Sequence, residues 1–212
     1  MLRISNFPPT TRRQGERLIR VVISFTIPNR LEFFLAGPVL LYRRLRYGYA
    51  FRKITLTKGK YAKVDPDDYY RLCEYKWRIS KDYGKFYAIR TGRKQDGKGR
   101  KVIRMHREVA KTPDGLECDH INGDSLDNRK ANLRSATRLQ NSWNRSKSSR
   151  PGYSKYKGVT FDKKMQKWFA QIRVRGKHIS LGRFEDEIEA AKAYDRAAKK
   201  HFGQFAKLNF KE

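Results

Sequence analysis

Polar side chains that could do chemistry follow one another at short intervals in the middle of this chain. Asp119 stands directly before His120. Asn132 comes twelve residues after the histidine, and Asn141 follows nine residues later. The histidine is one of 4 in the chain and lies in the segment ECDHINGD, residues 117–124. It is either part of a solvated turn or one half of a metal site whose other ligands come from further along the chain.

These residue types favour hydrolysis of a phosphodiester. The carboxylate of Asp119 and the amide oxygen of Asn141 are hard ligands of the kind that suits Mg²⁺, which keeps several of its waters. A neutral histidine, whose ordinary pKa is about 6.5, takes a proton from water at neutral pH. A bound metal polarises a phosphoryl oxygen and stabilises charge on the leaving oxygen. The pattern therefore indicates metal-assisted hydrolysis, with Mg²⁺ expected and Mn²⁺ as the alternative.

Two short strands and a helix are needed to bring these side chains together. Residues 116–121 and 132–137 are expected to be strands, joined by a polar loop rich in turn formers. Residues 138–145 are a helix candidate with Thr137 as its cap. If the helix packs across the hairpin, its amide faces the acid and the histidine.

The preceding residues, 51–115, are expected to form short strands and turns. Runs of β-prone residues occupy 53–57, 61–64, 86–91 and 101–105. The last two runs are expected to pair as a hairpin, because the segment between them contains Asp96-Gly97 and a second glycine. Asp65 followed by Pro66 is typical of the start of a helix.

The composition indicates a polyanionic partner. Lys and Arg total 50 against 21 Asp and Glu, which gives a formal net charge of +29. So much like charge repels itself and destabilises a compact fold unless a polyanion relieves it. Nucleic acid is the usual polyanion, bound through its phosphates with release of counterions, and a membrane surface is the alternative. The 12 Tyr, 12 Phe and 3 Trp are enough to build cores, so a disordered chain is not expected.

Cysteine content and hydropathy count against a zinc-stabilised, a disulfide-rich or a membrane-spanning protein. Cys73 and Cys118 are the only cysteines, so neither a structural zinc site nor a disulfide framework is expected. Residues 31–42 are apolar but reach only about half of the roughly 20 residues that cross a membrane. The first 15 residues lack acids and resemble a transit peptide weakly. We therefore expect a cytoplasmic protein, with an organelle as the alternative.

Residues 105–145, MHREVAKTPDGLECDHINGDSLDNRKANLRSATRLQNSWNR, carry a motif that is more specific than composition. The pattern DHxxG…NLR…T…QN resembles the HNH endonuclease family, in particular its phage and intron homing-type branch. The resemblance implies a ββα-metal fold in which His120 activates the attacking water. It also implies that Asp119 and Asn141 bind the divalent metal. Asn132 would orient the histidine and brace the loop.

Neighbouring residues of the motif also have structural interpretations. Asn128 is expected to be a turn residue, while Asp124 and Asp127 are expected to solvate the loop. His106 is expected to be structural or to contact a phosphate. Three cations are either phosphate clamps or part of a solvated face: Arg129, Lys130 and Arg134.

The last part of the chain has the pattern of a separate unit that follows a linker. Residues 146–152, SKSSRPG, are typical of a linker. Alternating runs at 156–161, 167–174 and 178–184 predict a three-stranded meander. Asp186 with Glu189 three residues later predicts a capping box that opens a helix, and Gly203 ends it.

Residues 156–210 contain YKGV, WxAxI, GxxxSLGxF, EAAxAYDxAA and GxxAxLNF. Together these motifs resemble the AP2 DNA-binding domain, which implies a three-stranded sheet laid in the major groove. The matching positions imply that Lys157 and Arg173 contact DNA, with Gln171 on the same face. Arg175, in the turn that follows, is a further candidate. Ser180 replaces the usual Trp before Leu-Gly, so the base preference of the family does not carry over.

We therefore expect an α+β protein with a ββα-metal nuclease unit, preceding β-hairpins and a C-terminal three-stranded antiparallel sheet packed on one helix. Its expected parts are an N-terminal extension of unknown role (1–50), an HNH nuclease domain (51–145), a linker (146–152) and an AP2 domain (153–212).

The expected function is a metal-dependent DNA endonuclease that the AP2 module targets to double-stranded DNA. Arg134 is expected to be a further DNA contact, and no protein partner is inferred. The arrangement looks like that of mobile, phage-borne homing endonucleases, a resemblance that implies the cytoplasm of a bacterial or phage-infected host cell. The main alternative is an AP2-type transcriptional regulator with an inactive nuclease remnant. A second alternative is a nucleoid protein that coats DNA without specificity.

Overall fold

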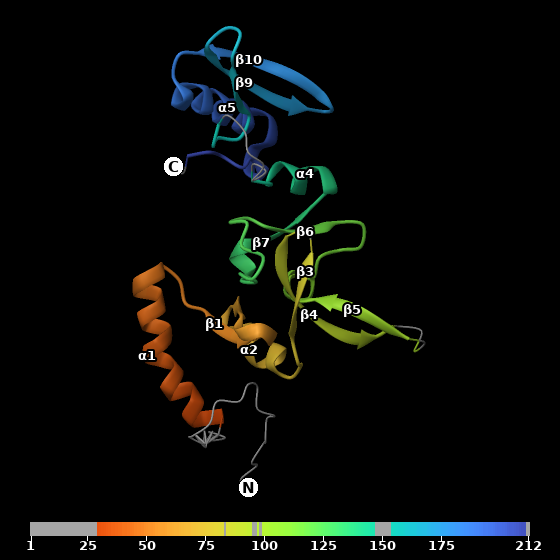
Figure 1. The fold of residues 1–212 in the computed structure, drawn as a ribbon. Helices are drawn as coiled ribbons and strands as arrows, with labels where there is room; N and C mark the ends of the chain where they lie inside the picture. The colour runs from red at the N-terminus through yellow and green to blue at the C-terminus, as the bar shows by residue number, and fades with distance from the viewer. Residues whose placement is uncertain (1–28, 83, 95–96, 98, 147–153, 211–212) are drawn as a thin grey trace, which may run out of the picture.

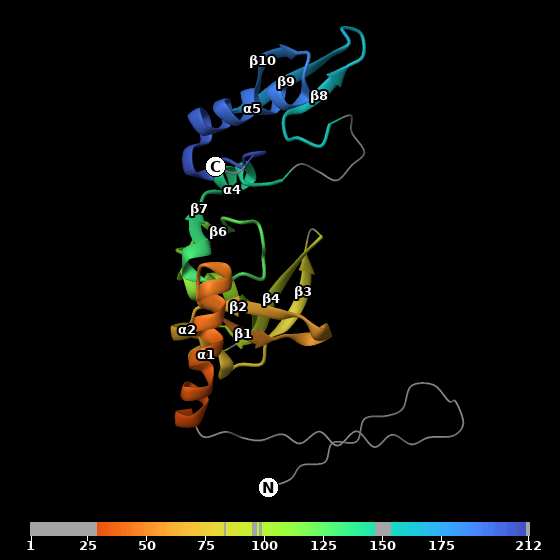
Figure 2. The ribbon, with the colours of Figure 1, turned by 90° about the vertical axis from the view of Figure 1, so that its left-hand side faces the viewer.

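The computed structural model describes residues 29–82, 84–94, 97, 99–146 and 154–210. Nearly all of the predicted linker and residues 1–28 of the predicted N-terminal extension lie outside these ranges. Helix α1 (Asn29–Tyr47) lies beside the first hairpin, whereas the C-terminal sheet lies at the far end of the molecule (Figures 1 and 2). In the described part of the chain, no helix combines the length and the apolar character of a membrane span.

Residues 52–110 fold into short strands and helices. They are β1 (Arg52–Thr55), β2 (Tyr61–Val64), α2 (Pro66–Cys73), β3 (Arg78–Asp82), β4 (Lys85–Arg93), β5 (Arg100–Arg104) and α3 (Met105–Ala110), with a 3-10 turn at Thr57–Gly59. Strand β3 and the earlier helix α1 were not predicted from the sequence. The antiparallel pairing of β4 with β5 confirms the predicted hairpin. One core is shared by apolar side chains of these elements, including Val64, Leu72, Trp77, Ala88 and Met105.

Helix α2 begins at the predicted residue, but Asp65 does not cap it with its side chain. The Asp65 carboxylate instead accepts a hydrogen bond from the Lys130 backbone N–H at 2.7 Å. Lys63 of β2 makes two backbone hydrogen bonds with the same loop, donating to Leu126 and accepting from Asn128, each at 2.8 Å. The loop of the polar motif is therefore held by the N-terminal hairpin region.

The polar motif forms the expected ββα unit. β6 (Glu117–His120) pairs antiparallel with β7 (Leu133–Ala136) in a register that places Asp119 opposite Arg134. A 3-10 turn at Lys130–Asn132 precedes β7, and α4 (Arg138–Trp143) follows it. Thr137 and Gln140 form a reciprocal capping box at the start of α4. The cap fixes where the helix begins and therefore which of its residues face β6.

The C-terminal part confirms the predicted three-stranded sheet on one helix. It contains β8 (Val159–Asp162), β9 (Lys167–Val174), β10 (Lys177–Phe184), α5 (Glu187–Phe202) and a 3-10 turn at Gly203–Phe205. The sheet order is β10-β9-β8. Ala190, Ala191 and Ala198 have no exposed surface, so the helix lies close against the sheet. Gly158 has a φ of +78°, and a Cβ there would approach the Tyr194 ring to 2.0 Å.

The nuclease-like unit and the C-terminal unit meet at α4. The Trp143 ring stacks on Phe202 with 4.5 Å between centroids. The Lys157 ammonium donates to the Trp143 carbonyl at 2.6 Å. Arg134 donates to the Gln204 carbonyl at 2.5 Å, and its guanidinium lies 4.2 Å from the centroid of the Phe205 ring. The helix that follows the polar motif is thus also a packing element of the C-terminal core.

Candidate functional site

The Asp119 carboxylate is 4% exposed and is surrounded by donors. Arg134 donates to Asp119 Oδ2 from Nε at 2.9 Å and from Nη2 at 2.7 Å. The Asn144 amide nitrogen lies 3.0 Å from Oδ1 and 3.1 Å from Oδ2 of the same carboxylate. Because the bonds from Arg134 are charge-assisted and the donors reach both oxygens, the carboxylate is held in a single orientation.

His120 is 7% exposed and is oriented by Asn128. Its Nε2 lies 3.3 Å from Asn128 Oδ1, and the Asn128 amide nitrogen donates to the Leu126 carbonyl at 3.3 Å. The second bond fixes which end of the amide faces the ring, and an amide oxygen only accepts. Nε2 therefore carries the hydrogen, and Nδ1 keeps the lone pair that can take a proton. Burial lowers the pKa of His120, which favours this neutral form.

Two further rings pack beside His120. The His106 ring centroid lies 5.0 Å from that of His120, and the Tyr87 centroid lies 6.4 Å away. Burial lowers the pKa of His106 to about 3, and the charges of Arg104 and Arg107 act in the same direction. His106 is therefore uncharged at neutral pH, and its ring packs against one side of His120. Successive residues of a strand point to opposite sides, so Asp119 faces α4 whereas His120 faces α3 and β4.

Asn132 braces the loop between the two strands. Its side-chain oxygen accepts from the Asn122 backbone N–H at 2.9 Å, and its amide donates to the Asp127 carbonyl at 2.8 Å. The side chain that contacts the imidazole is that of Asn128, which we interpreted from the sequence as a turn residue. The function of Asn132 and its effect on the histidine stay predictions.

The loop is organised around Asp127, which the sequence analysis placed in solvent. This carboxylate has no exposed surface. It accepts from Arg129 Nε at 2.8 Å, from Arg129 Nη2 at 2.7 Å and from the Asn122 amide at 3.0 Å. Burial raises the pKa of Asp127, but the hydrogen bonds and charge of Arg129 outweigh it, and the net pKa is lowered. The expectation of a solvated Asp127 was wrong, because the strands close the loop over it.

The side chains of Asn141 on α4 and of Asn144 at the C-terminal end of the helix both face β6. Asn141 donates to the Glu117 carboxylate, whereas Asn144 is the residue that contacts Asp119. Glu117 and Asp119 lie on one face of the strand, and positions three apart lie on one face of a helix. The sequence analysis chose Asn141 and overlooked Asn144, although the spacing of the two asparagines was a signal that both share a face. The assignment of Asn141 to a metal remains a prediction.

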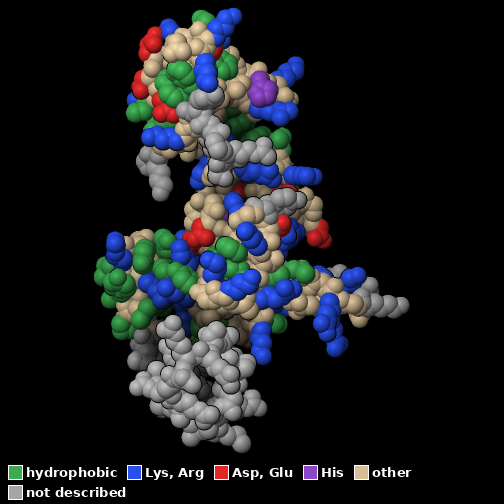
Figure 3. Space-filling model, viewed as in Figure 1, with side chains coloured by type: hydrophobic (Ala, Val, Ile, Leu, Met, Phe, Trp, Pro, Cys, Tyr) green, Lys and Arg blue, Asp and Glu red, His purple; other side chains and the backbone are tan. Residues whose placement is uncertain are grey.

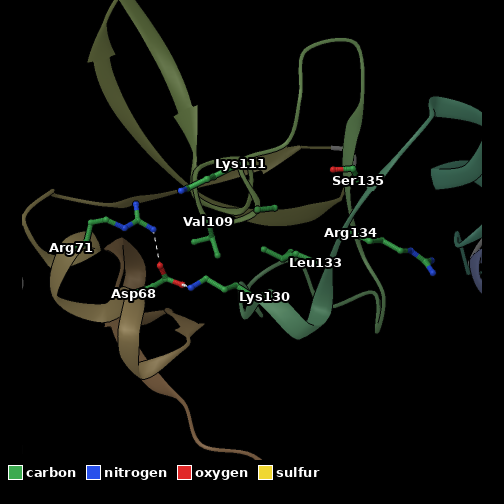
Figure 4. A pocket seen from close by; sticks show the side chains of 9 residues that line it. Asp68, Arg71, Val109, Lys111, Lys130, Leu133, Arg134 and Ser135 are labelled. Carbon is green, nitrogen blue, oxygen red and sulfur yellow. Dashed lines mark hydrogen bonds and ion pairs between the residues drawn. The ribbon is translucent and has the colours of Figure 1, made fainter.

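The cations near the motif are engaged with acids of the chain. Arg129 pairs with Asp127, and its guanidinium lies 3.3 Å from the Tyr49 ring centroid. Lys130 pairs with Asp68 at 3.0 Å. Figure 4 shows Lys130 and Arg71 converging on Asp68, whereas the Arg134 side chain points away from them. Arg134, predicted to contact DNA, is paired with Asp119 and has a side chain that is 13% exposed.

Among the predicted DNA contacts of the C-terminal part, Lys157 lies against α4, whereas Gln171 and Arg173 lie on β9. Lys157 is half-buried, and burial and the charge of Lys207 lower its pKa to about 8. Gln171 and Arg173 lie on the face of β9 opposite to buried Ala170 and Ile172, which pack toward α5. A pocket of about 570 Å³ between α4 and this end of the sheet is lined by Trp143, Gln171, Arg173, Arg175 and His178.

The turn that contains Arg175 is tight and left-handed. Arg175 has a φ of 48° and Gly176 a φ of 82°. Positive φ at both central residues is the conformation of a two-residue hairpin turn with the twist of the flanking strands. Arg173 donates to the Gly176 carbonyl at 3.2 Å and so braces the turn. The role of these arginines in DNA binding stays a prediction.

The Asp119 carboxylate is the candidate ligand for a divalent metal, and in this structure its oxygens accept hydrogen bonds from Arg134 and from the Asn144 amide nitrogen. Within the described ranges, no three His, Cys, Asp or Glu side chains form a group that could hold a metal ion. A metal at this position would be held by one carboxylate, substrate phosphate and water, and by an amide oxygen only if Asn141 or Asn144 turned it toward the metal, because the amide nitrogens of both face carboxylates here. This donor set suits Mg²⁺, which usually keeps several of its waters.

Comparisons with known proteins agree with this geometry. A model of the HNH endonuclease family matches residues 106–143. An uncharacterized HNH endonuclease of Acanthamoeba polyphaga mimivirus is 30% identical over 193 residues, which cover 87% of this chain and 88% of the viral protein. This chain belongs to the HNH endonuclease family.

The HNH endonuclease also carries an AP2 domain, whose family model matches residues 154–204. An AP2-like ethylene-responsive transcription factor of Arabidopsis thaliana is 46% identical over 57 residues, which are 27% of this chain and 12% of the plant protein. Protein 3.8 of Escherichia phage T7 is 33% identical over 96 residues, which are 45% of this chain and 78% of the phage protein. The two domains together indicate that this HNH endonuclease binds DNA.

Proposed function

We propose that this HNH endonuclease hydrolyses phosphodiester bonds of double-stranded DNA with Mg²⁺ or Mn²⁺, and that residues 153–212 target it to preferred sites, as in homing endonucleases. The observation that carries the proposal is the arrangement around β6. A buried acid and a buried neutral histidine are adjacent on the strand, and the amides of Asn141 and Asn144 face the side of the acid.

His120 is the general base of this proposal. The hydrogen bond from Nε2 to Asn128 leaves the lone pair of Nδ1 to take a proton from water. His106 and Tyr87 limit the directions from which water reaches the ring, because both pack against it. The proton then rests on an imidazole flanked by Asp119, whose charge favours the imidazolium.

Asp119 and the amide oxygen of Asn141 or Asn144 would hold the metal. A bound metal would supply charge stabilisation at the phosphoryl and leaving oxygens. Arg134 and Asn144 orient the Asp119 carboxylate. Where a metal took the place of one of these hydrogen bonds, the Arg134 guanidinium would be available to a neighbouring phosphate.

The AP2 domain supplies affinity rather than chemistry. Its sheet face with Gln171 and Arg173 is proposed to enter a groove of the duplex. Tethering the two units raises the effective concentration of one at the DNA once the other is bound. The contacts of α4 with Phe202 and Lys157 fix the two units against each other, so the distance between bound site and cut is expected to be constant.

Metal removal tests the proposal directly. Supercoiled plasmid incubated with the protein is expected to be nicked or linearised with Mg²⁺ or Mn²⁺ and to stay intact with EDTA. The reason is that Asp119 and an amide cannot neutralise the charge of the transition state without the cation. Absence of cutting with every divalent metal, together with site-confined binding in a footprint, would instead support an AP2-type regulator with an inactive nuclease remnant.

The amides of Asn141 and Asn144 are expected to differ in their effects. Asn144→Ala removes a donor that orients Asp119, and loss of such an outer partner typically reduces metal affinity or activity by about 10- to 100-fold. Asn141→Ala, if Asn141 is the ligand, raises the Mn²⁺ concentration needed for half-maximal cleavage and weakens Mn²⁺ binding to the DNA complex. Ser142→Ala on the same helix is the matched control. Equal metal requirements for Asn141→Ala and the control would remove Asn141 from the metal site.

A further inference from the structure

The sheet β3-β4-β5 lies outside both family matches and has two unlike faces. On one face, Ala88 is buried and packs with Trp77 in the main core. Side chains of directly paired residues share a face, so the register assigns the other face. It carries Lys85, Tyr87, Ile89, Thr91 and Arg93 of β4, Arg100, Val102 and Arg104 of β5, and Arg78, Ser80 and Asp82 of β3.

This second face is continuous with the proposed catalytic histidine. Tyr87 lies on it, and its ring centroid is 6.4 Å from that of His120. The Arg104 guanidinium on the neighbouring strand lies 5.7 Å from the Tyr87 centroid. Ile89, the next residue of β4 on this face, is buried. Beyond Ile89, Thr91, Arg93, Arg100 and Val102 are exposed, so the open part of the face runs outward along β4 and β5.

The outward surface is rich in cations. The register places five cations and one acid of the three strands on this face: Arg78, Lys85, Arg93, Arg100 and Arg104, and Asp82. On the face that continues from His120, Lys85, Arg93 and Arg100 are exposed. Asp82 is an acid on this face, and it pairs with Arg104 at 2.9 Å. Figure 3 shows Lys and Arg side chains over the hairpin that projects from the body of the molecule.

We propose that this face of the sheet, with Lys85 on the β3–β4 hairpin and Arg93 and Arg100 on the β4–β5 hairpin, binds the phosphate backbone of duplex DNA beside the scissile phosphate. An antiparallel two-stranded ribbon has the width that a DNA groove admits. Its cations neutralise phosphates and release counterions, which supplies affinity without reading sequence. The position beside the cut rests on the function proposed for His120, whereas the binding itself does not.

The test compares two double variants of the full chain. Arg93→Ala with Arg100→Ala removes a directly paired couple on the proposed face. Lys81→Ala with Lys101→Ala removes two exposed cations from the opposite face of the same sheet and is the matched control. Binding to a duplex is measured with EDTA over a range of salt concentrations, so that cleavage plays no part in the readout.

Arg93 and Arg100 together are expected to account for about two phosphate contacts. In the Arg93/Arg100 variant the slope of log K against log salt becomes shallower by about 2, and affinity at about 0.1 M salt falls roughly 10- to 100-fold. The control keeps the slope of the unmodified protein. An unchanged slope in the Arg93/Arg100 variant, equal losses in both variants, or preferential binding of duplex RNA would overturn the assignment. If the unmodified protein never cuts DNA but the salt slopes of the two variants differ as expected, the nuclease proposal fails. The proposal that this face of the sheet binds DNA is then still supported.

Discussion

Replacing His120 with alanine is expected to slow metal-dependent cleavage of DNA by about 10³-fold, within the range of 10²–10⁴ typical of general bases. The hydrogen bond from Nε2 to Asn128 positions the lone pair of Nδ1 in the unmodified protein. Without the imidazole, the water must lose its proton to solvent. Binding of the same DNA in EDTA is expected to stay within about 2-fold of the unmodified protein, because His120 is buried and carries no charge when free.

The measurement is single-turnover cleavage of a labelled duplex, with thermal unfolding to show that the variant is folded. His201→Ala replaces an exposed histidine at the end of α5 and serves as the matched control. A folded His120→Ala protein that cuts within 10-fold of the control would exclude the imidazole as the base. His106 would not replace it in that case, because its pKa of about 3 makes it a poor proton acceptor at neutral pH.

Asp127→Ala is expected to be the most destabilising single change in the polar loop. It leaves the Arg129 side chain, whose residue is 9% exposed, without its carboxylate. Breaking a buried ion pair by removal of one partner typically costs about 3–5 kcal/mol. The free energy of unfolding from urea titration is expected to fall by this amount, and the thermal midpoint by roughly 10 °C. Cleavage should fall too, because Asn122 donates to this carboxylate and Asn132 to the carbonyl of the same residue.

Asp124→Ala is the matched control in the same loop. Asp124 lies 3.5 Å from the Lys63 ammonium and its side chain is 46% exposed, so the pair is worth less than about 1 kcal/mol. If both aspartates gave the same small loss, the loop would not be organised around a buried carboxylate. A large loss of stability with normal cleavage by the remaining folded protein would separate the loop from the site and contradict the link through Asn122 and Asn132.

Contacts between the two domains also hold residues of the site in place. Arg134 bonds to the Asp119 carboxylate and to the Gln204 carbonyl, so one side chain connects the proposed metal ligand with the end of the AP2 domain. Trp143, two residues after Asn141 on α4, stacks on Phe202 of α5. Docking of the AP2 domain and placement of the two amides therefore depend on the same short helix.

The local pattern of the sequence determined much of this protein. The alternation of residues 156–184 was enough for the three-stranded sheet, because side chains of a strand must alternate between a packed and an open face. Cap residues Thr137 and Asp186 determined the starts of α4 and α5. The spacing from Asp119 to Asn141 identified the ββα unit, and the excess of Lys and Arg indicated a polyanion.

Only the tertiary structure decided which polar groups meet. Asn128 was interpreted as a turn residue and Asp127 as a solvated loop residue, yet the contacts of Asn128 with β2 and of Asp127 with Arg129 accompany burial of both. Asn144 donates to Asp119 whereas Asn141 donates to Glu117, and both contacts join α4 and its C-terminal end to a strand more than twenty residues earlier in the chain. Contacts between residues far apart in the chain depend on tertiary packing, and no short-range pattern of residues records it.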